Sequence, residues 1–177
     1  GLLRPIPHGT WNVGTPMLED LKAGKRGEHA SNLGALIAAE LVAGTDKPAF
    51  IVDPVVVDEA DPKVKVTGLK ELPRRVISHA LNQIATAHRY AEDRGLPYEK
   101  VNLIVAHLGG GITVGAHKRG RYIDVNNGLD GEGPFSPQRS GSLPPGQLID
   151  LCFSGKYTKA ELKLLNRLSL FGGAEVA

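Results

Sequence analysis

A run of three glycines, Gly109, Gly110 and Gly111, stands directly after His107 and Leu108. Glycines between two strands permit positive φ angles and let backbone N–H groups approach an anion without obstruction from side chains. A tight hairpin that needs glycine only for steric reasons is the alternative. His107 would present a hydrogen-bond donor to whatever this turn holds, although a histidine at a strand end is more often structural. The stretch is therefore a candidate anion site.

Two charged side chains elsewhere in the chain could act with this turn. Asp53 follows the apolar run 49–52, and open α/β sheets present functional groups at the ends of their strands. A turn cap shared with Pro54 explains this aspartate equally well. Arg139 lies in a polar loop where packing requires no arginine, and a guanidinium suits the oxygens of a phosphoryl group in transfer. A solvated surface arginine is the alternative.

The glycine run does not fit the common nucleotide-binding motifs. A dinucleotide fold needs a helix that begins at the glycines, whereas the β-branched residues 112–114 predict a strand. A Walker loop is excluded because no Gly-Lys-Ser/Thr follows. His79 and His88 are too far apart for the usual metal-ligand spacing, and no Cys/His cluster indicates zinc. We interpret His79 as an inward-facing polar residue.

Hydrophobic periodicity, glycine and proline predict the elements that position these residues. We expect helices over residues 15–23, 28–42, 74–94, 146–153 and 158–168, and strands over 49–52, 101–108, 112–117 and 122–125. The last three strands form a meander that opens with the glycine turn. The strand 49–52 is expected to be a buried parallel strand. Residues 126–145 are expected to form a functional loop.

Composition limits the class of protein. The chain has 177 residues, of which 41% are hydrophobic and 23% charged, which fits one large or two small globular domains. A net charge of +2 is too small for the basic footprint of a general nucleic-acid binder. No apolar stretch approaches the roughly 20 residues that span a membrane. The single cysteine, Cys152, makes a cytoplasmic protein the default expectation.

Several long stretches resemble the acetate kinase family and, among its members, the butyrate kinases. They are VNLIVAHLGGGITVGAH at 101–117, YIDVNN at 122–127, DGEGPFSP at 130–137, GEHASNLG at 27–34 and SHALNQ at 78–83. The resemblance extends from the first residues to about Tyr157. It implies an actin-like, ribonuclease H-like α/β fold. Residues 1–72 would end a first domain, and residues 73–177 would begin a second one that contains the meander and its helices.

The resemblance also implies a reaction, the transfer of a phosphoryl group between ATP and butyrate with Mg²⁺. His107 and Arg139 would stabilise the planar phosphoryl group, and Asp53 would be catalytic and help to hold the metal. The three glycines, Gly109, Gly110 and Gly111, would bind the nucleotide phosphates. An acetate or propionate kinase is one alternative, and a nucleotide-binding module without turnover is another. The family further implies a homo-oligomer.

Some parts of the family pattern have no counterpart in this sequence. They are the opening phosphate turn, the arginine near the acyl substrate, the adenosine loop and a C-terminal metal-site glutamate. The chain begins at Gly1 without a methionine and ends shortly after Phe171-Gly172-Gly173 without a cap or polar tail. We therefore expect a central fragment of a longer enzyme, inactive in isolation.

Overall fold

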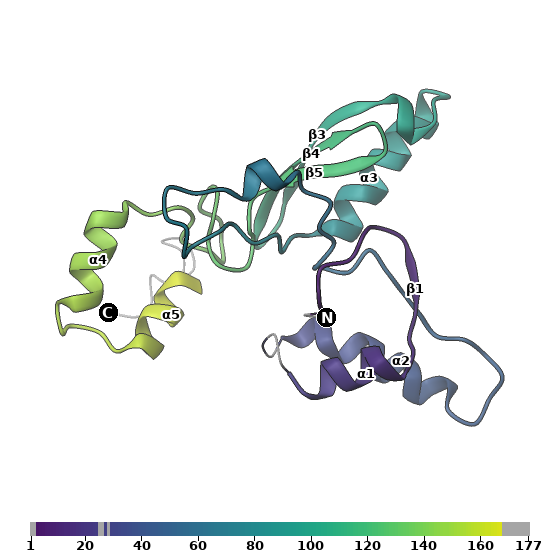
Figure 1. Ribbon diagram of the computed structural model, residues 1–177, viewed down its shortest axis with the longest axis horizontal. Coiled ribbons are helices and arrows are strands. Elements are labelled where there is room, and N and C mark those ends of the chain that lie inside the picture. The colour runs from purple at the N-terminus through teal and green to yellow at the C-terminus, as the bar shows by residue number, and fades with distance from the viewer. Residues whose placement is uncertain (1–2, 25–26, 28, 168–177) are drawn as a thin grey trace.

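A computed structural model of the chain describes residues 3–24, 27 and 29–167. Its N-terminal part contains α1 (Thr15–Lys22), α2 (Leu33–Val42) and two short strands. A three-stranded sheet covered by α3 (Ala80–Asp93) follows, and α4 (Pro145–Phe153) and α5 (Lys159–Arg167) form the last part. Figure 1 shows the α4–α5 segment at the end of the molecule away from the three-stranded sheet. The chain thus combines helices and antiparallel strands in connected but distinct parts.

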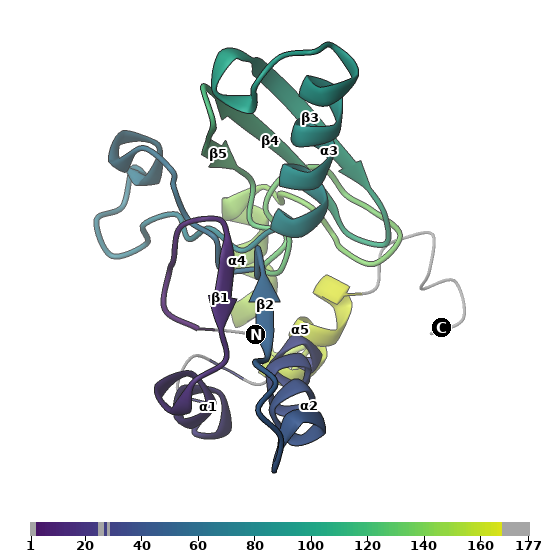
Figure 2. The ribbon, with the colours of Figure 1, turned by 90° about the vertical axis from the view of Figure 1, so that its right-hand side faces the viewer.

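The three-stranded sheet is the meander that the sequence predicts. It consists of β3 (Asn102–Leu108), β4 (Ile112–Lys118) and β5 (Arg121–Val125), all antiparallel and in that order. Leu108 pairs with Ile112, so the three glycines form the turn between β3 and β4. Figure 2 shows α3 lying across one face of this sheet. The side of α3 that carries Ile84 and Ala87 is buried.

Helix α3 begins later than its predicted start at residue 74. The backbone before it instead bonds to distant segments: Ser78 N donates to Val55 O at 3.0 Å, and Ile77 O accepts from Gly128 N at 2.9 Å. The apolar spacing that continues back to Ile77 suggested a longer helix, but these long-range bonds occupy the groups that helical bonds would need. As a result His79 is the residue before the helix, beside the sheet.

The two N-terminal strands correct a second expectation. β2 (Phe50–Val52) pairs antiparallel with β1 (Thr10–Asn12), a strand the sequence did not predict, and is therefore not the buried parallel strand that we expected. Phe50 is 52% exposed and Val52 is 46% exposed. A short apolar run predicts a strand, but it does not specify whether the partner strand runs parallel or antiparallel to it.

The predicted helix 28–42 begins later in the structure. α2 starts at Leu33 after a short 3₁₀ turn (Ala30–Asn32), and the predicted start at Glu28 lies outside the described residues. α4 and α5 match their predicted ranges to within two residues. Leu168, the predicted end of the last helix, lies outside the described residues, as do Gly1 and residues 171–173. Of the helices that the structure describes, none is both long and apolar enough to cross a bilayer.

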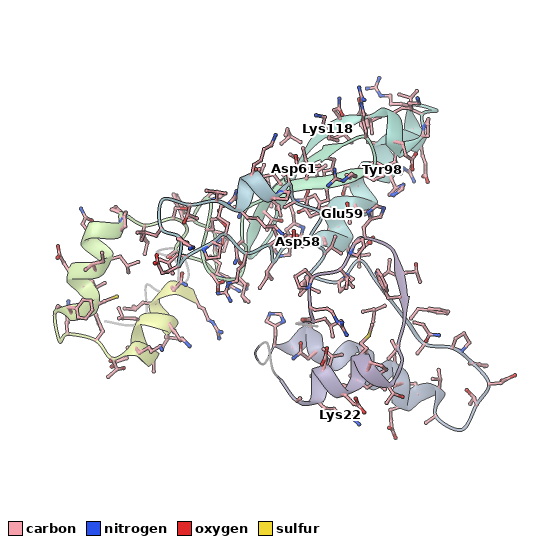
Figure 3. All side chains as sticks on the ribbon, in the orientation of Figure 1. Lys22, Asp58, Glu59, Asp61, Tyr98 and Lys118 are labelled. Carbon is pink, nitrogen blue, oxygen red and sulfur yellow. The ribbon has the colours of Figure 1, made fainter. Side chains whose placement is uncertain are left out.

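The polar segment 55–73 connects the N-terminal part to the meander through charged side chains. Glu59 accepts the backbone N–H of Tyr122 at 2.9 Å, and its other oxygen lies 2.6 Å from Nδ1 of His8. Asp61 N donates to Ile123 O at 3.1 Å. Figure 3 shows Asp58, Glu59 and Asp61 where this segment passes the sheet. The segment is loop-rich as predicted, apart from one short 3₁₀ turn (Pro62–Lys65).

Candidate functional site

The glycine turn is bonded to the polar loop that carries Arg139. Gly110 O accepts two hydrogen bonds from this loop, from Gln138 N at 2.9 Å and from Ser136 Oγ at 2.7 Å. Gly109 N donates to Gly111 O at 3.2 Å, which closes the turn. The N–H groups of Gly110 and Gly111 donate to no residue that the structure describes. Two backbone donors of the turn are thus available to an anion.

The positive φ angles that we expected in the glycine turn are not found. None of the three glycines has a positive φ, so their conformational freedom is not what the turn uses. A Cβ at each position would instead meet a side chain: His107 Nε2 at 2.7 Å from Gly109, Gln138 Oε1 at 2.5 Å from Gly110, and His79 Cε1 at 3.2 Å from Gly111. Absent side chains therefore let two imidazoles and an amide approach the turn.

Two histidines stack beside this turn. The rings of His79 and His107 lie 3.9 Å apart and within 10° of parallel. His107, near the end of β3, has its Nδ1 at 3.0 Å from Asn82 Oδ1 on α3. His79, just before α3, has its Nδ1 at 3.1 Å from Thr113 Oγ1 on β4. The late start of α3 is what places His79 here.

His79 is a site residue that the sequence reasoning did not select. It was interpreted only as an inward-facing polar residue, although it belongs to the family-like stretch SHALNQ at 78–83, which was the one signal that could have identified it. Burial lowers its pKa below the ordinary value, and the charges of His107 and Arg139 lower it further. His79 is therefore neutral at pH 7, and the positive charge of Arg139 acts on it.

Arg139 has one nitrogen that is buried without a partner. Its Nη1 donates to Gln138 O at 2.6 Å, whereas Nε has no hydrogen-bond partner in the described structure. A buried donor that is left unpaired costs about 1–3 kcal/mol, so this nitrogen is suited to an acceptor that the described residues do not supply. Burial, and then Arg167, lower the pKa of the guanidinium.

Arg139 and His79 line one cavity of about 120 Å³, together with His29, Ile77 and Leu129 among others. His79 also lines a larger groove of about 650 Å³ between α2, β2 and the start of α3. Asp53 and His107 belong to that groove. The structure therefore brings Asp53 and His107 to one groove and Arg139 to the adjoining cavity, with His79 bordering both.

Asp53 makes long-range hydrogen bonds to Gly9 rather than the turn cap with Pro54 that was the alternative in the sequence analysis. Its Oδ1 accepts the N–H of Gly9 at 2.6 Å, and its own N–H donates to Gly9 O at 3.1 Å. With a φ of 39°, it adopts the left-handed conformation that Asp tolerates better than most residues. No three His, Cys, Asp or Glu side chains gather into a metal-binding group within the described ranges.

Known protein structures show which fold this is. No protein-family model matches the sequence. A crystal structure of an acetate kinase from Porphyromonas gingivalis matches at a TM-score of 0.75 and 22% identity, and the alignment covers 92% of this chain and 43% of the kinase. The chain has the acetate kinase fold. Two further structures support this. A propionate kinase from Francisella tularensis subsp. tularensis matches at a TM-score of 0.71 and 21% identity, over 94% of this chain and 47% of the kinase. An acetate kinase from Entamoeba histolytica matches at a TM-score of 0.73 and 16% identity, over 98% of this chain and 49% of the kinase.

The chain spans less than half the length of each of these kinases. The match confirms the coarse prediction of a mixed α/β fold like that of the acetate kinases. Within this part of the acetate kinase fold, the expected site residues come from separate segments, namely the end of β2, the end of β3, the glycine turn and the loop before α4.

Proposed function

We propose that this chain is part of an ATP-dependent carboxylate kinase, which transfers a phosphoryl group between ATP and a short-chain fatty acid. The buried, unpartnered Nε of Arg139 carries this proposal. It lies in a loop that is hydrogen-bonded to the glycine turn, next to His79. A positively charged donor beside free backbone N–H groups is an arrangement suited to phosphate oxygens.

The chemistry of phosphoryl transfer fits the groups present. The reaction needs positioning and neutralisation of charge more than it needs a covalent nucleophile. A carboxylate substrate is already ionised at neutral pH, so no strong general base is required. The N–H groups of Gly110 and Gly111 would hold nucleotide phosphates, and His107 and Arg139 would face the planar group as it moves. All four come from two segments that are bonded together.

Asp53 is our candidate for the Mg²⁺ site. Magnesium is usually held by one or two carboxylates together with substrate phosphates and water, so a single aspartate fits better than a ready-made cage would. The bond from Gly9 to Oδ1 fixes the carboxylate and leaves Oδ2 for the cation. Bound Mg²⁺ would supply neutralisation of phosphate charge, and Asp53 would orient it in the same groove as His107.

The acyl substrate of this chain is a separate part of the proposal. The matched structures are acetate and propionate kinases, which favours acetate or propionate over the butyrate suggested by the resembling stretches. We also propose that residues 1–72 and 73–177 belong to the two domains of the actin-like fold, and that the parent protein is a homo-oligomer.

The test uses the protein encoded by the full reading frame that contains this chain. Incubation with ATP, Mg²⁺, hydroxylamine and, in turn, acetate, propionate or butyrate should give an acyl hydroxamate with at least one acid, and the ratio of rates ranks the substrates.

Arg139→Ala should lower kcat by about 10²–10³-fold, as expected for one lost charged donor, with little change in the Kd for ATP. Arg94→Ala, at an exposed arginine over Tyr90, is the matched control. The absence of hydroxamate with all three acids would overturn the proposal.

A further inference from the structure

A line of buried hydrogen bonds runs between α3 and the meander to the candidate site. It begins at Tyr98, whose OH lies 2.7 Å from Nδ1 of His117, and His117 Nε2 lies 3.3 Å from Gln83 Oε1. Gln83 Nε2 then contacts Thr113, and Thr113 contacts His79. Gln83 and Thr113 are 0% exposed and His117 is 2% exposed. Water therefore cannot replace any partner in the middle of this line.

The amide of Gln83 fixes the direction of these bonds. Its Nε2 lies 2.8 Å from the carbonyl oxygen of Thr113, which can only accept, so the NH₂ group must face Thr113. Its Oε1 therefore faces His117, and the ring nitrogen there must carry a proton. Burial lowers the pKa of His117 to about 4, so the ring is neutral and its Nδ1 accepts from Tyr98.

The same reasoning assigns the proton on His79. Thr113 Oγ1 accepts from Gln83 Nε2 at 3.2 Å. Its own hydroxyl proton needs an acceptor, because an unpaired buried donor is costly. Among the described residues, the acceptor in reach is His79 Nδ1 at 3.1 Å. His79 Nδ1 therefore carries no proton, and a neutral ring must hold its proton on Nε2.

The Nε2 edge of this ring faces the glycine turn. A Cβ placed on Gly111 would lie 3.5 Å from His79 Nε2 and 3.2 Å from its Cε1. We propose that Thr113 and Gln83 are positioning residues, which hold His79 with its proton on Nε2 so that the ring donates a hydrogen bond to an anion at the glycine turn. That the anion is a phosphoryl oxygen rests on the proposed function, whereas the assignment of the proton does not.

The neighbouring histidine is held in a different way. His107 Nδ1 lies 3.0 Å from Asn82 Oδ1, and no buried partner among the described residues fixes the orientation of this amide. Asn82 is exposed, and its amide is free to rotate in water. Only His79 is therefore locked by the core.

The proton position can be measured directly by NMR. In the 177-residue chain labelled with ¹⁵N-histidine, long-range ¹H–¹⁵N spectra at pH 7 distinguish protonated from unprotonated ring nitrogens, and His79→Gln identifies the His79 signals. We expect Nδ1 of His79 to be unprotonated and Nε2 to be protonated. A protonated Nδ1 on His79 in the unsubstituted chain would overturn the proposal.

Variants of Thr113 show which side chain sets the proton position. Thr113→Val removes the hydroxyl at nearly constant shape and should give a mixture of tautomers, whereas Thr113→Ser should keep the single Nε2–H form. Tyr98→Phe is the control, because Gln83 stays held by the carbonyl of Thr113 and the His79 signals should not move. An unchanged tautomer in Thr113→Val, or an altered one in Tyr98→Phe, would contradict the assignment to Thr113 and Gln83.

A kinetic measurement separates this inference from the proposed function. In the full-length protein, Thr113→Val should lower kcat about tenfold, as expected for one misdirected hydrogen bond, with little change in KM for ATP, and Thr113→Ser should restore it. If the NMR result holds but the full-length protein has no kinase activity, the positioning of His79 stands and the carboxylate kinase proposal fails. If kcat is unaffected although the tautomer changes, His79 is not a donor in the reaction.

Discussion

The meander with α3 and the α4–α5 segment hold their side chains in opposite ways. Four of the largest fully buried side chains belong to the first region, and they are Tyr122, His117, Gln83 and Thr113. Neither α4 nor α5 has a buried residue among those described, and Phe153 is 86% exposed. The first region has a polar core that fixes the orientation of its side chains, whereas the second presents helices with an open apolar face.

This difference explains where the candidate site is rigid. Buried polar networks favour one arrangement when every member is bonded, and His79 is the last member of such a network. Arg139 lies in the loop between the two regions, bonded to the glycine turn at one side and followed by α4 at the other. The residues that need fixed geometry thus come from the well-packed region, and the loop brings Arg139 to them.

The largest effect that would test this comparison is expected at Gly115 in β4. A Cβ there would collide with Cε2 of Tyr122 and come within 2.9 Å of Gln83 Oε1, and both side chains are buried and bonded. We expect Gly115→Ala to lower the free energy of unfolding by about 1–3 kcal/mol, a usual range for overpacking. Urea denaturation of the 177-residue chain measures it. A change below about 0.5 kcal/mol, the size usual for substitutions at the surface, would show that this core is less tightly packed than described.

A smaller effect concerns the dependence of stability on pH. Burial lowers the pKa of His117 from 6.5 to about 4, so the unfolded chain binds more protons between these values. The free energy of unfolding should therefore fall as the pH is lowered from about 6.5 towards 4, by about 1–2 kcal/mol from this group. Urea titrations at pH 7 and pH 5 measure the difference. His117→Gln should reduce it, and equal slopes in the two proteins would contradict the prediction.

The smallest effect is expected in α4. A Cβ added at Gly146 would meet no atom within 4 Å beyond the backbone of its own helix, and alanine favours helix over glycine by up to about 1 kcal/mol. Gly146→Ala should therefore leave the free energy of unfolding unchanged or raise it by up to that amount. The same urea experiment applies, with Gly115→Ala as the opposite case. A loss of more than about 1 kcal/mol, which is typical of buried positions, would mean that α4 is packed more closely than the comparison with the meander implies.

Much of the fold followed from local patterns, and the remainder depended on distant partners. The meander was predictable because alternating apolar residues and a glycine run specify strands and a turn within one short stretch. The start of α3 was not, because the bond between Ser78 and Val55 joins segments far apart in the sequence. The antiparallel pairing of β2 was missed for the same reason.

The candidate site likewise has residues that local sequence could identify and others whose role depends on distant partners. Residue type and position were enough to select His107, Arg139 and Asp53, and the structure brings them to adjoining cavities. The role of His79 depends on where α3 begins and on Thr113, which is far away in the chain. The purpose of the glycines was also missed, since the atoms that a Cβ would meet at Gly110 and Gly111 belong to remote residues. Non-local contacts decided each of these points.

The double hydrogen bond to Gly110 O has a mechanical consequence. Because Ser136 and Gln138 both attach to this one carbonyl, Arg139 is tethered one residue away from an anchor on the β3–β4 hairpin. If the hairpin tip moved when an anion bound, the guanidinium would move with it. The glycine turn and Arg139 would therefore shift together relative to the anion, rather than independently.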